Sequence, residues 1–289
     1  MPKTPKAAAL GGALRQAREQ KGLGLREFAA QLGRDPGILS RWESGERTPR
    51  PEDVARLLSV LGVDSARYED LMTLVQGSKE PQWVATTLPE QRQQMAAFIE
   101  HEQKAALITQ VSPLLLPGLV QIPEYTRAIM ARGGIPAAEI SERVAARLAR
   151  KEVITGPRSA QLLALIGEAA LYQQVCARPA MIAQLRHLLE IAHLRNAEVR
   201  VAPFGGGWHP GLEGAFTLMR SESGRVVFIE TRRSSLLLHQ EEDIRAYEQA
   251  ADNMEQVTMS RDRSARFISD LILRMESSDD PARVAQVEP

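Results

Sequence analysis

The sequence has little cysteine, no long apolar run and no net charge. Cys176 is the single cysteine among 289 residues, which excludes an internal disulfide and a zinc finger built from paired cysteines. No apolar run is long enough to cross a bilayer, and the N-terminal residues lack the apolar core of a secretory signal. We therefore expect a protein of the reducing cytoplasm, associated with the nucleoid if it binds DNA, and no membrane segment.

The net charge of zero conceals an uneven distribution along the chain. Residues 1–56 contain 11 Lys and Arg against 7 Asp and Glu, an excess of four positive charges that the remaining residues balance. A basic segment favours a polyanion as partner, although ordinary surface variation produces the same difference. The charge distribution alone does not distinguish a polyanion-binding segment from ordinary surface variation.

Residues 1–77 show the helical period. Leu25, Phe28, Ala29 and Leu32 form one apolar stripe, which Gly33 ends. Similar stripes before and after it are interrupted about every ten residues by glycine, proline or a capping residue. The pattern predicts five short helices and therefore an all-α head over residues 1–77.

The third predicted helix has the clearest boundaries. Asp35 supplies a carboxylate that caps free backbone N–H groups, and Pro36 takes the first helical position, where its missing N–H costs nothing. Leu39 and Trp42 share one face, which we expect to point inward. The outer face carries small or hydrogen-bonding residues that suit close approach to DNA: Gly37, Ser40, Arg41 and Ser44.

The stretch LRQAREQKGLGLREFAAQLGRDPGILSRWESGERTP resembles the helix-turn-helix of Cro and phage repressors over residues 10–65. The resemblance implies that the helix at 36–44 enters the major groove of double-stranded DNA. It also implies an ion pair between Arg18 and Glu43, with two unpaired surface charges as the alternative. The family's base-contacting positions fall on Pro36, Gly37 and Arg41. Arg41 is the strong donor suited to a guanine, and a phosphate contact is its alternative role.

Two departures from the family change the expected contacts to the DNA backbone. Leu25 replaces the glutamine that usually starts the second helix, and Arg34 stands where a small apolar residue is common. Nearby arginines have to supply the phosphate contacts, although each is equally suited to an ordinary solvated surface. The predicted DNA-binding set is Arg26, Arg34, Asp35, Pro36, Gly37, Ser40, Arg41, Ser44, Arg47 and Arg50.

After the head we expect a linker over residues 78–86, a larger α+β domain over residues 87–277 and a flexible tail over residues 278–289. Helices are predicted over residues 91–109, 123–130, 144–153, 180–194, 241–254 and 263–275. Strand-like runs fall at residues 160–166, 198–201, 215–219 and 226–229, with a turn at Ser223 and Gly224 between the last two. Four short strands predict a small sheet.

The segments LLLPGLVQIPEYTRAIM, IGEAAL and VVFIE resemble the domain that follows a Cro-like head in a large actinobacterial family of regulators described as antitoxin-like. The resemblance implies a repressor or autoregulator that works with a small protein encoded nearby. We also expect a homodimer, because an isolated head buries little area on DNA. The alternatives are an adaptor that mainly sequesters the small partner and a larger domain that senses a small molecule.

No pattern in the larger domain indicates an enzyme, a metal site or a cofactor. His187, Glu190 and His193 share one predicted helix, but the two histidines are too far apart in the helical repeat to bind one zinc ion. Glu168, Trp208 and His209 are the candidates for a ligand or partner pocket. The alternatives are an ordinary surface loop at GGGWHPG and a glutamate that interacts with a helix dipole.

Overall fold

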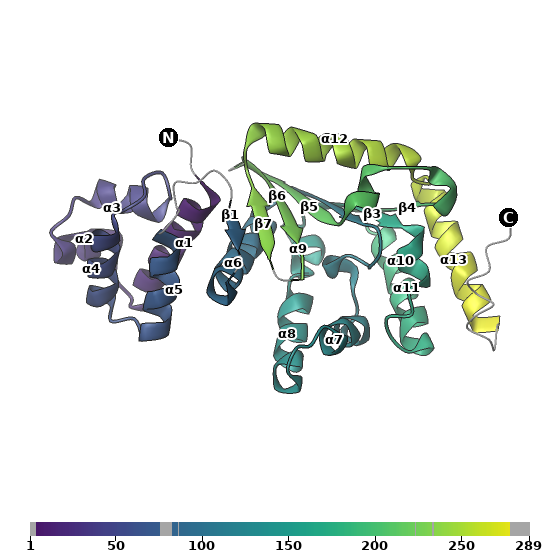
Figure 1. The fold of residues 1–289 in the computed structure, drawn as a ribbon, viewed down its shortest axis with the longest axis horizontal. Coiled ribbons are helices and arrows are strands. Elements are labelled where there is room, and N and C mark those ends of the chain that lie inside the picture. Colours follow the sequence, from purple (N-terminus) through teal and green to yellow (C-terminus); the bar gives the residue numbers. More distant parts are fainter. Residues whose placement is uncertain (1–3, 76–82, 86, 223, 233, 278–289) are drawn as a thin grey trace. The chain divides into compact units, whose positions relative to one another are not determined.

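The computed structural model describes residues 4–75, 83–85, 87–222, 224–232 and 234–277 (Figure 1). The chain divides into two compact units, residues 1–101 with 226–244 and residues 102–225 with 245–289. The predicted tail at 278–289 and most of the predicted linker lie outside the described residues. Residues 83–85, which we expected within that linker, form a strand.

The predicted five-helix head is confirmed. It consists of α1 (Pro5–Gln20), α2 (Leu25–Leu32), α3 (Pro36–Glu43), α4 (Pro51–Leu61) and α5 (Ser65–Val75). Helices α2 and α4 end at Gly33 and Gly62, whose φ angles of 62° and 56° are left-handed and therefore favour glycine. The apolar stripes meet in one core, whose fully buried large side chains are Phe28, Leu10, Leu14, Leu39, Leu57, Leu58, Leu61, Leu71 and Leu74.

The rest of the first unit combines one helix with antiparallel strands. Strand β7 (Ser235–Leu238) pairs with β1 (Trp83–Ala85) on one side and with β6 (Gly224–Glu230) on the other. Helix α6 (Leu88–Lys104) packs onto these strands, because the rings of Phe98 and Phe228 lie 4.4 Å apart. Gln94 also donates to the backbone oxygen of Trp83 at 2.5 Å. The segment after the head is thus tied to a hairpin from much later in the chain.

The second unit contains strands in the order β5-β2-β3-β4. Strands β2 (Leu107–Ser112), β3 (Gln161–Gly167) and β4 (Ala197–Ala202) are parallel, and β5 (Phe216–Ser221) runs antiparallel to β2. The register places Ser112 opposite Ile166 and Gly167 opposite Ala202. Strand β3 is an almost continuous apolar run and is buried over most of its length, as expected for a parallel strand covered on both faces.

Helices surround these strands. The described helices from Gly118 onward are η1 (Gly118–Val120), α7 (Pro123–Arg132), α8 (Ala137–Ala149), α9 (Glu152–Thr155), α10 (Glu168–Tyr172), α11 (Arg178–Ala192), η2 (Phe204–Gly206), η3 (Pro210–Glu213), α12 (Glu241–Val257) and α13 (Arg261–Ser277). Helices α11 and α13 contact each other and β4. Met130, Ile140 and Val144 form a separate small core between α7 and α8.

The sheet is larger than the sequence predicts, with seven strands in a mixed arrangement. The four predicted strands correspond to β3, β4, β5 and β6. The predicted helix at 91–109 runs into the first residues of β2, because Leu107 continues the helical spacing of α6 while α6 itself ends at Lys104. Strand β1 has three residues and β7 has four, so neither is long enough to show an alternating pattern. Ser223 of the predicted turn lies outside the described residues.

Candidate nucleic-acid interface

The N-terminal end of α3 is fixed by the two residues that the sequence suggests, Asp35 and Pro36. The carboxylate of Asp35 accepts hydrogen bonds from the backbone N–H groups of Gly37 at 2.9 Å and Ile38 at 3.3 Å. Pro36 occupies the first turn, where its missing N–H leaves no bond unmade. At the other end Gly45 adopts a φ of 74°, which lets the chain leave the helix axis at once.

Glycines also allow α1 to approach the end of α3 closely. A Cβ atom on Gly11 would lie 2.5 Å from the backbone oxygen of Trp42, and one on Gly45 would lie 2.7 Å from the Cα of Ala8. Both distances are shorter than a carbon atom tolerates, so larger residues would push the two helices apart. The position of α3 against α1 therefore depends on backbone contact as well as on side chains.

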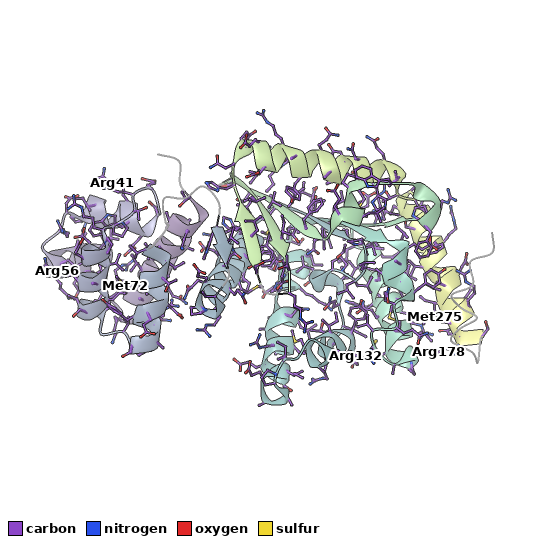
Figure 2. The ribbon with its side chains drawn as sticks, in the orientation of Figure 1. Arg41, Arg56, Met72, Arg132, Arg178 and Met275 are labelled. Atoms are coloured by element: carbon purple, nitrogen blue, oxygen red, sulfur yellow. The ribbon has the colours of Figure 1, made fainter. Side chains whose placement is uncertain are left out.

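The inward and outward faces of α3 differ sharply. Leu39 is fully buried and Trp42 is 5% exposed. On the other side Gly37, Ser40 and Arg41 are exposed, and Figure 2 shows Arg41 at the surface of the head beside α3. The small residues of this outer face allow close approach to a nucleic acid, and the exposed acidic side chain beside them, Asp35, has its carboxylate bonded to the backbone N–H groups of the helix.

An ion pair holds α3 against α1. Arg18 donates from Nε and Nη2 to the two carboxylate oxygens of Glu43, at 2.7 and 2.8 Å, and from Nη1 to the backbone oxygen of Leu23 at 2.6 Å. Both side chains are buried. The hydrogen bonds to Glu43 raise the pKa of Arg18. A buried pair of this kind fixes the angle at which the outer face of α3 is presented.

The predicted arginines all lie at the surface but differ in their contacts. Arg26, Arg34, Arg41, Arg47 and Arg50 are exposed. The guanidinium of Arg34 pairs with Asp53 of α4 and lies 6.0 Å from the ring centre of Trp42. Arg41 donates from Nε to the backbone oxygen of Gly37 at 3.1 Å, so its side chain follows the helix. A contact of Arg41 with a base through Nε requires that bond to break, whereas a contact through its two Nη groups does not.

Asp35 and Ser44, which were also predicted to contact DNA, form hydrogen bonds within the head. The Asp35 carboxylate caps α3, and the hydroxyl of half-buried Ser44 donates to the backbone oxygen of Arg41 at 3.3 Å. Asp53 was not among the residues predicted for this site. The sequence does mark this position, because Asp53 is an acidic residue in the first turn of α4, where the helix dipole favours negative charge.

In the second unit the three pocket candidates differ in exposure. Glu168 is buried and accepts a hydrogen bond from the backbone N–H of Phe204 at 2.9 Å. His209 is buried, and its Nδ1 has no hydrogen-bond partner among the described residues. Trp208 is 69% exposed. Glu168 therefore anchors the loop that carries Trp208 and His209. Trp208 faces solvent, whereas His209 faces the interior.

The loop that Glu168 anchors exposes a group of large apolar side chains. Phe204 is 57%, Trp208 69% and Leu212 59% exposed. Phe204 also stacks on Tyr172 of α10, with ring centres 6.1 Å apart. Of these three residues only Trp208 was predicted to take part in a site. The spacing of four residues between the large apolar side chains of this glycine-rich loop can be read from the sequence.

The part of the chain that the structure describes contains no group of three or more His, Cys, Asp or Glu arranged to hold a metal ion. None of its helices is long and apolar enough to cross a membrane.

Comparison with known families matches two segments. Residues 9–71 match a family model described as a helix-turn-helix domain. Residues 95–270, more than half of the chain, match a model described as a domain of unknown function, DUF5753. Neither the curated proteins nor the solved structures give a match.

Proposed function

The chain belongs to the DUF5753 family and carries a helix-turn-helix domain, and from this premise we propose that it is a sequence-specific regulator of transcription that inserts α3 into the major groove of double-stranded DNA. The observation that carries the proposal is the outer face of α3, where Gly37 and Ser40 are small and Arg41 is the long cation. Small residues let the helix approach base edges, and the guanidinium then matches the two acceptors of a guanine.

Phosphate contacts surround this helix in the proposal. Arg26, Arg47 and Arg50 are exposed and supply charge without reading sequence. Arg34 joins them when phosphate replaces Asp53 as its partner. Asp35 and Ser44 contribute by holding α3 in shape, so we assign them a supporting role in place of direct contact.

The decisive experiment selects binding sites from random duplexes with the full-length protein. The affinity of the selected duplex is then measured for the wild type, Arg41→Ala and the control Arg56→Ala. Arg56 is an exposed arginine of α4 that lies away from Arg41 in Figure 2, so the control removes the same charge from another face of the head.

We expect Arg41→Ala to lose roughly 1–3 kcal/mol of binding free energy and the preference for one guanine. Arg56→Ala should lose little. The proposal fails if the selection returns no preferred sequence, or if the two variants bind the selected duplex equally well.

We also propose that the protein binds as a homodimer and represses, in part at its own promoter. The support is the small area of a single head and the antitoxin-like resemblance of the sequence. Selected sites should then contain two inverted half-sites about one helical turn apart. A single asymmetric half-site would argue for a monomer, and activation of a reporter from such a site would argue against repression.

A second candidate function rests on the exposed apolar loop. Phe204, Trp208 and Leu212 form the kind of surface that proteins use to bind partners or ligands. In this alternative the protein is an adaptor that sequesters a small partner encoded nearby, or a sensor of a small molecule, and it catalyses no reaction. Co-purification with the neighbouring small protein, with and without DNA, separates the adaptor from the regulator, and Trp208→Ser should abolish the complex.

A further inference from the structure

Three titratable side chains of the second unit, Lys151, His187 and Glu190, are linked by hydrogen bonds, and we call this chain of contacts the relay. The Nζ of Lys151 lies 2.8 Å from Nε2 of His187, and Nδ1 of His187 lies 2.9 Å from Oε2 of Glu190. Lys151 precedes α9, while His187 and Glu190 lie one turn apart on α11. The contact between α9 and α11 therefore places an amine, an imidazole and a carboxylate in line.

The hydrogen-bond chemistry determines the protonation of the histidine. An ionised Glu190 can only accept, so Nδ1 of His187 carries the proton and donates it. The Nε2 of the neutral ring is then a lone pair, and it faces the amine of Lys151. This is the order of groups in which a base removes a proton from a nucleophile while a carboxylate orients the base and stabilises its charged form.

The surroundings of Lys151 favour loss of its proton while leaving it accessible. Burial lowers the pKa of Lys151, and the negative charge of Glu190 opposes part of that shift. Lys151 is half-buried, and the side chain of His187 is 21% exposed. Glu190 is exposed, so a small reagent can reach the cluster from solvent.

We propose that Lys151 is a site of covalent acylation by activated acyl donors of the thioester or acyl-phosphate class. His187 accepts one proton from the ammonium group, and the neutral amine attacks the acyl carbon. A C–N bond forms and the C–S or C–O bond to the leaving group breaks. The second amine proton goes to the departing thiolate or phosphate, His187 returns its proton to water, and no oxidation occurs.

The modification changes the charge of the cluster. The resulting amide is neutral and keeps one N–H for Nε2 of His187, so the contact between α9 and α11 persists without the positive charge of Lys151. Loss of that charge leaves Glu190 with the imidazole as its partner. The site is therefore a point where acyl-donor concentration can alter the larger domain.

The chain is convenient for testing this, because it contains only six lysines among its 36 basic residues. The full-length protein is incubated at about pH 7 with acetyl phosphate or with acetyl-coenzyme A, and acetylation at each lysine is followed by mass spectrometry. Exposed Lys21, in the other unit, is the internal reference. We expect Lys151 to react roughly tenfold faster than Lys21, somewhat below the usual contribution of a positioned base because Glu190 is open to solvent.

Two variants show whether the relay causes the difference. His187→Asn should bring the rate at Lys151 down towards that of Lys21 and leave Lys21 unchanged. Glu190→Gln should lower the rate at Lys151 less, because it also removes a negative charge that opposes the loss of the proton from Lys151. The rate at Lys151 should also reach its plateau at a lower pH in the wild type than in His187→Asn. If His187→Asn perturbs folding, exposed Glu190→Gln carries the test. Equal rates at the two lysines, or an unaltered rate at Lys151 in both variants, would overturn the proposal. Reaction with one donor alone would identify the source of the acyl group.

Discussion

The head and the second unit each contain an arginine–glutamate pair with the same two hydrogen-bond distances, but the arginine is buried in the head and half-buried in the second unit. Arg18 bonds to Glu43 at 2.7 and 2.8 Å, and Arg150 bonds to Glu102 at the same two distances. The first pair joins helices 25 residues apart and fixes the surface proposed to meet DNA. The second joins segments 48 residues apart and holds the scaffold of the larger unit. The same kind of pair thus orients α3 in the head and joins two segments far apart in the chain in the second unit.

The largest expected effects come from breaking these pairs one at a time. Glu43→Ala leaves the buried guanidinium of Arg18 without its carboxylate, which costs about 3–5 kcal/mol of folding stability. Glu102→Ala removes the carboxylate that the half-buried Arg150 contacts, and it should cost less. We expect the greater loss for Glu43→Ala, because the side chain of the remaining Arg18 is 8% exposed whereas that of Arg150 is 14% exposed. Hydrogen exchange followed by mass spectrometry localises each loss.

The comparison predicts separate responses in that experiment. Glu43→Ala should deprotect amides of α1 and α3 and abolish specific DNA binding, while Glu102→Ala should deprotect β2 and α8. Glu139→Ala, which breaks the exposed pair with Arg143 on α8, is the control and should cost less than about 1 kcal/mol. Deprotection of both units by either variant would mean that the two pairs are not independent.

The same contrast explains what could be predicted from the sequence. In the head, Phe28, Leu32 and Leu39 fall at helical spacing within short segments, and glycines such as Gly33 mark the ends, so local pattern determines the elements. The larger unit depends on pairing between distant strands. Strand β1 pairs with β7, which lies some 150 residues later in the chain, and the residues around Trp83 and Leu237 do not indicate that the two strands pair.

The candidate site shows the same division. The capping role of Asp35 and the inward position of Trp42 follow from their neighbours, so sequence reasoning reaches them. The pairing of Arg34 with Asp53, and of Lys151 with His187, depends on how separate elements pack. Such contacts cannot be derived from spacing, because the same residues would be ordinary surface charges under another packing.

Gly167 and Gly33 are both required by the backbone, but for different physical reasons. Gly167 ends β3 with an ordinary φ of −66°, but a Cβ there would lie 2.4 Å from the backbone oxygen of Pro113. Gly33 in the head has a left-handed φ of 62° and no described atom within 4 Å of a Cβ. We expect Gly167→Ala to cost about 1–3 kcal/mol through overpacking and Gly33→Ala about 1 kcal/mol through backbone strain. Urea unfolding measures both, and the reverse order would contradict this account.

A smaller effect is expected from an exposed pair in each unit. Asp53→Asn removes the carboxylate that holds Arg34, so Arg34 becomes available to a phosphate and DNA affinity should rise by about tenfold or less. The slope of log affinity against log salt should steepen by about one unit. Glu276→Gln, which releases Arg186 in the larger unit, removes the same charge and should leave the slope unchanged. An equal gain in both variants would indicate a general charge effect.

The smallest effect is a pH dependence that each unit should show separately. Burial lowers the pKa of His209 in the larger unit from its ordinary value of 6.5, and burial does the same for His239 in the first unit, where Asp243 opposes it. Above pH 6.5 both rings are neutral whether the chain is folded or unfolded, so stability does not change. As the pH falls below that value the unfolded chain takes up a proton first, and stability declines until the lowered folded pKa is reached. We expect His209→Gln to remove this acid sensitivity from η3 and its surroundings, and His239→Gln to remove it from β7. Hydrogen exchange at about pH 7 and about pH 5, corrected for intrinsic rates, measures both, and acid sensitivity that persists in the double variant would assign it to other groups.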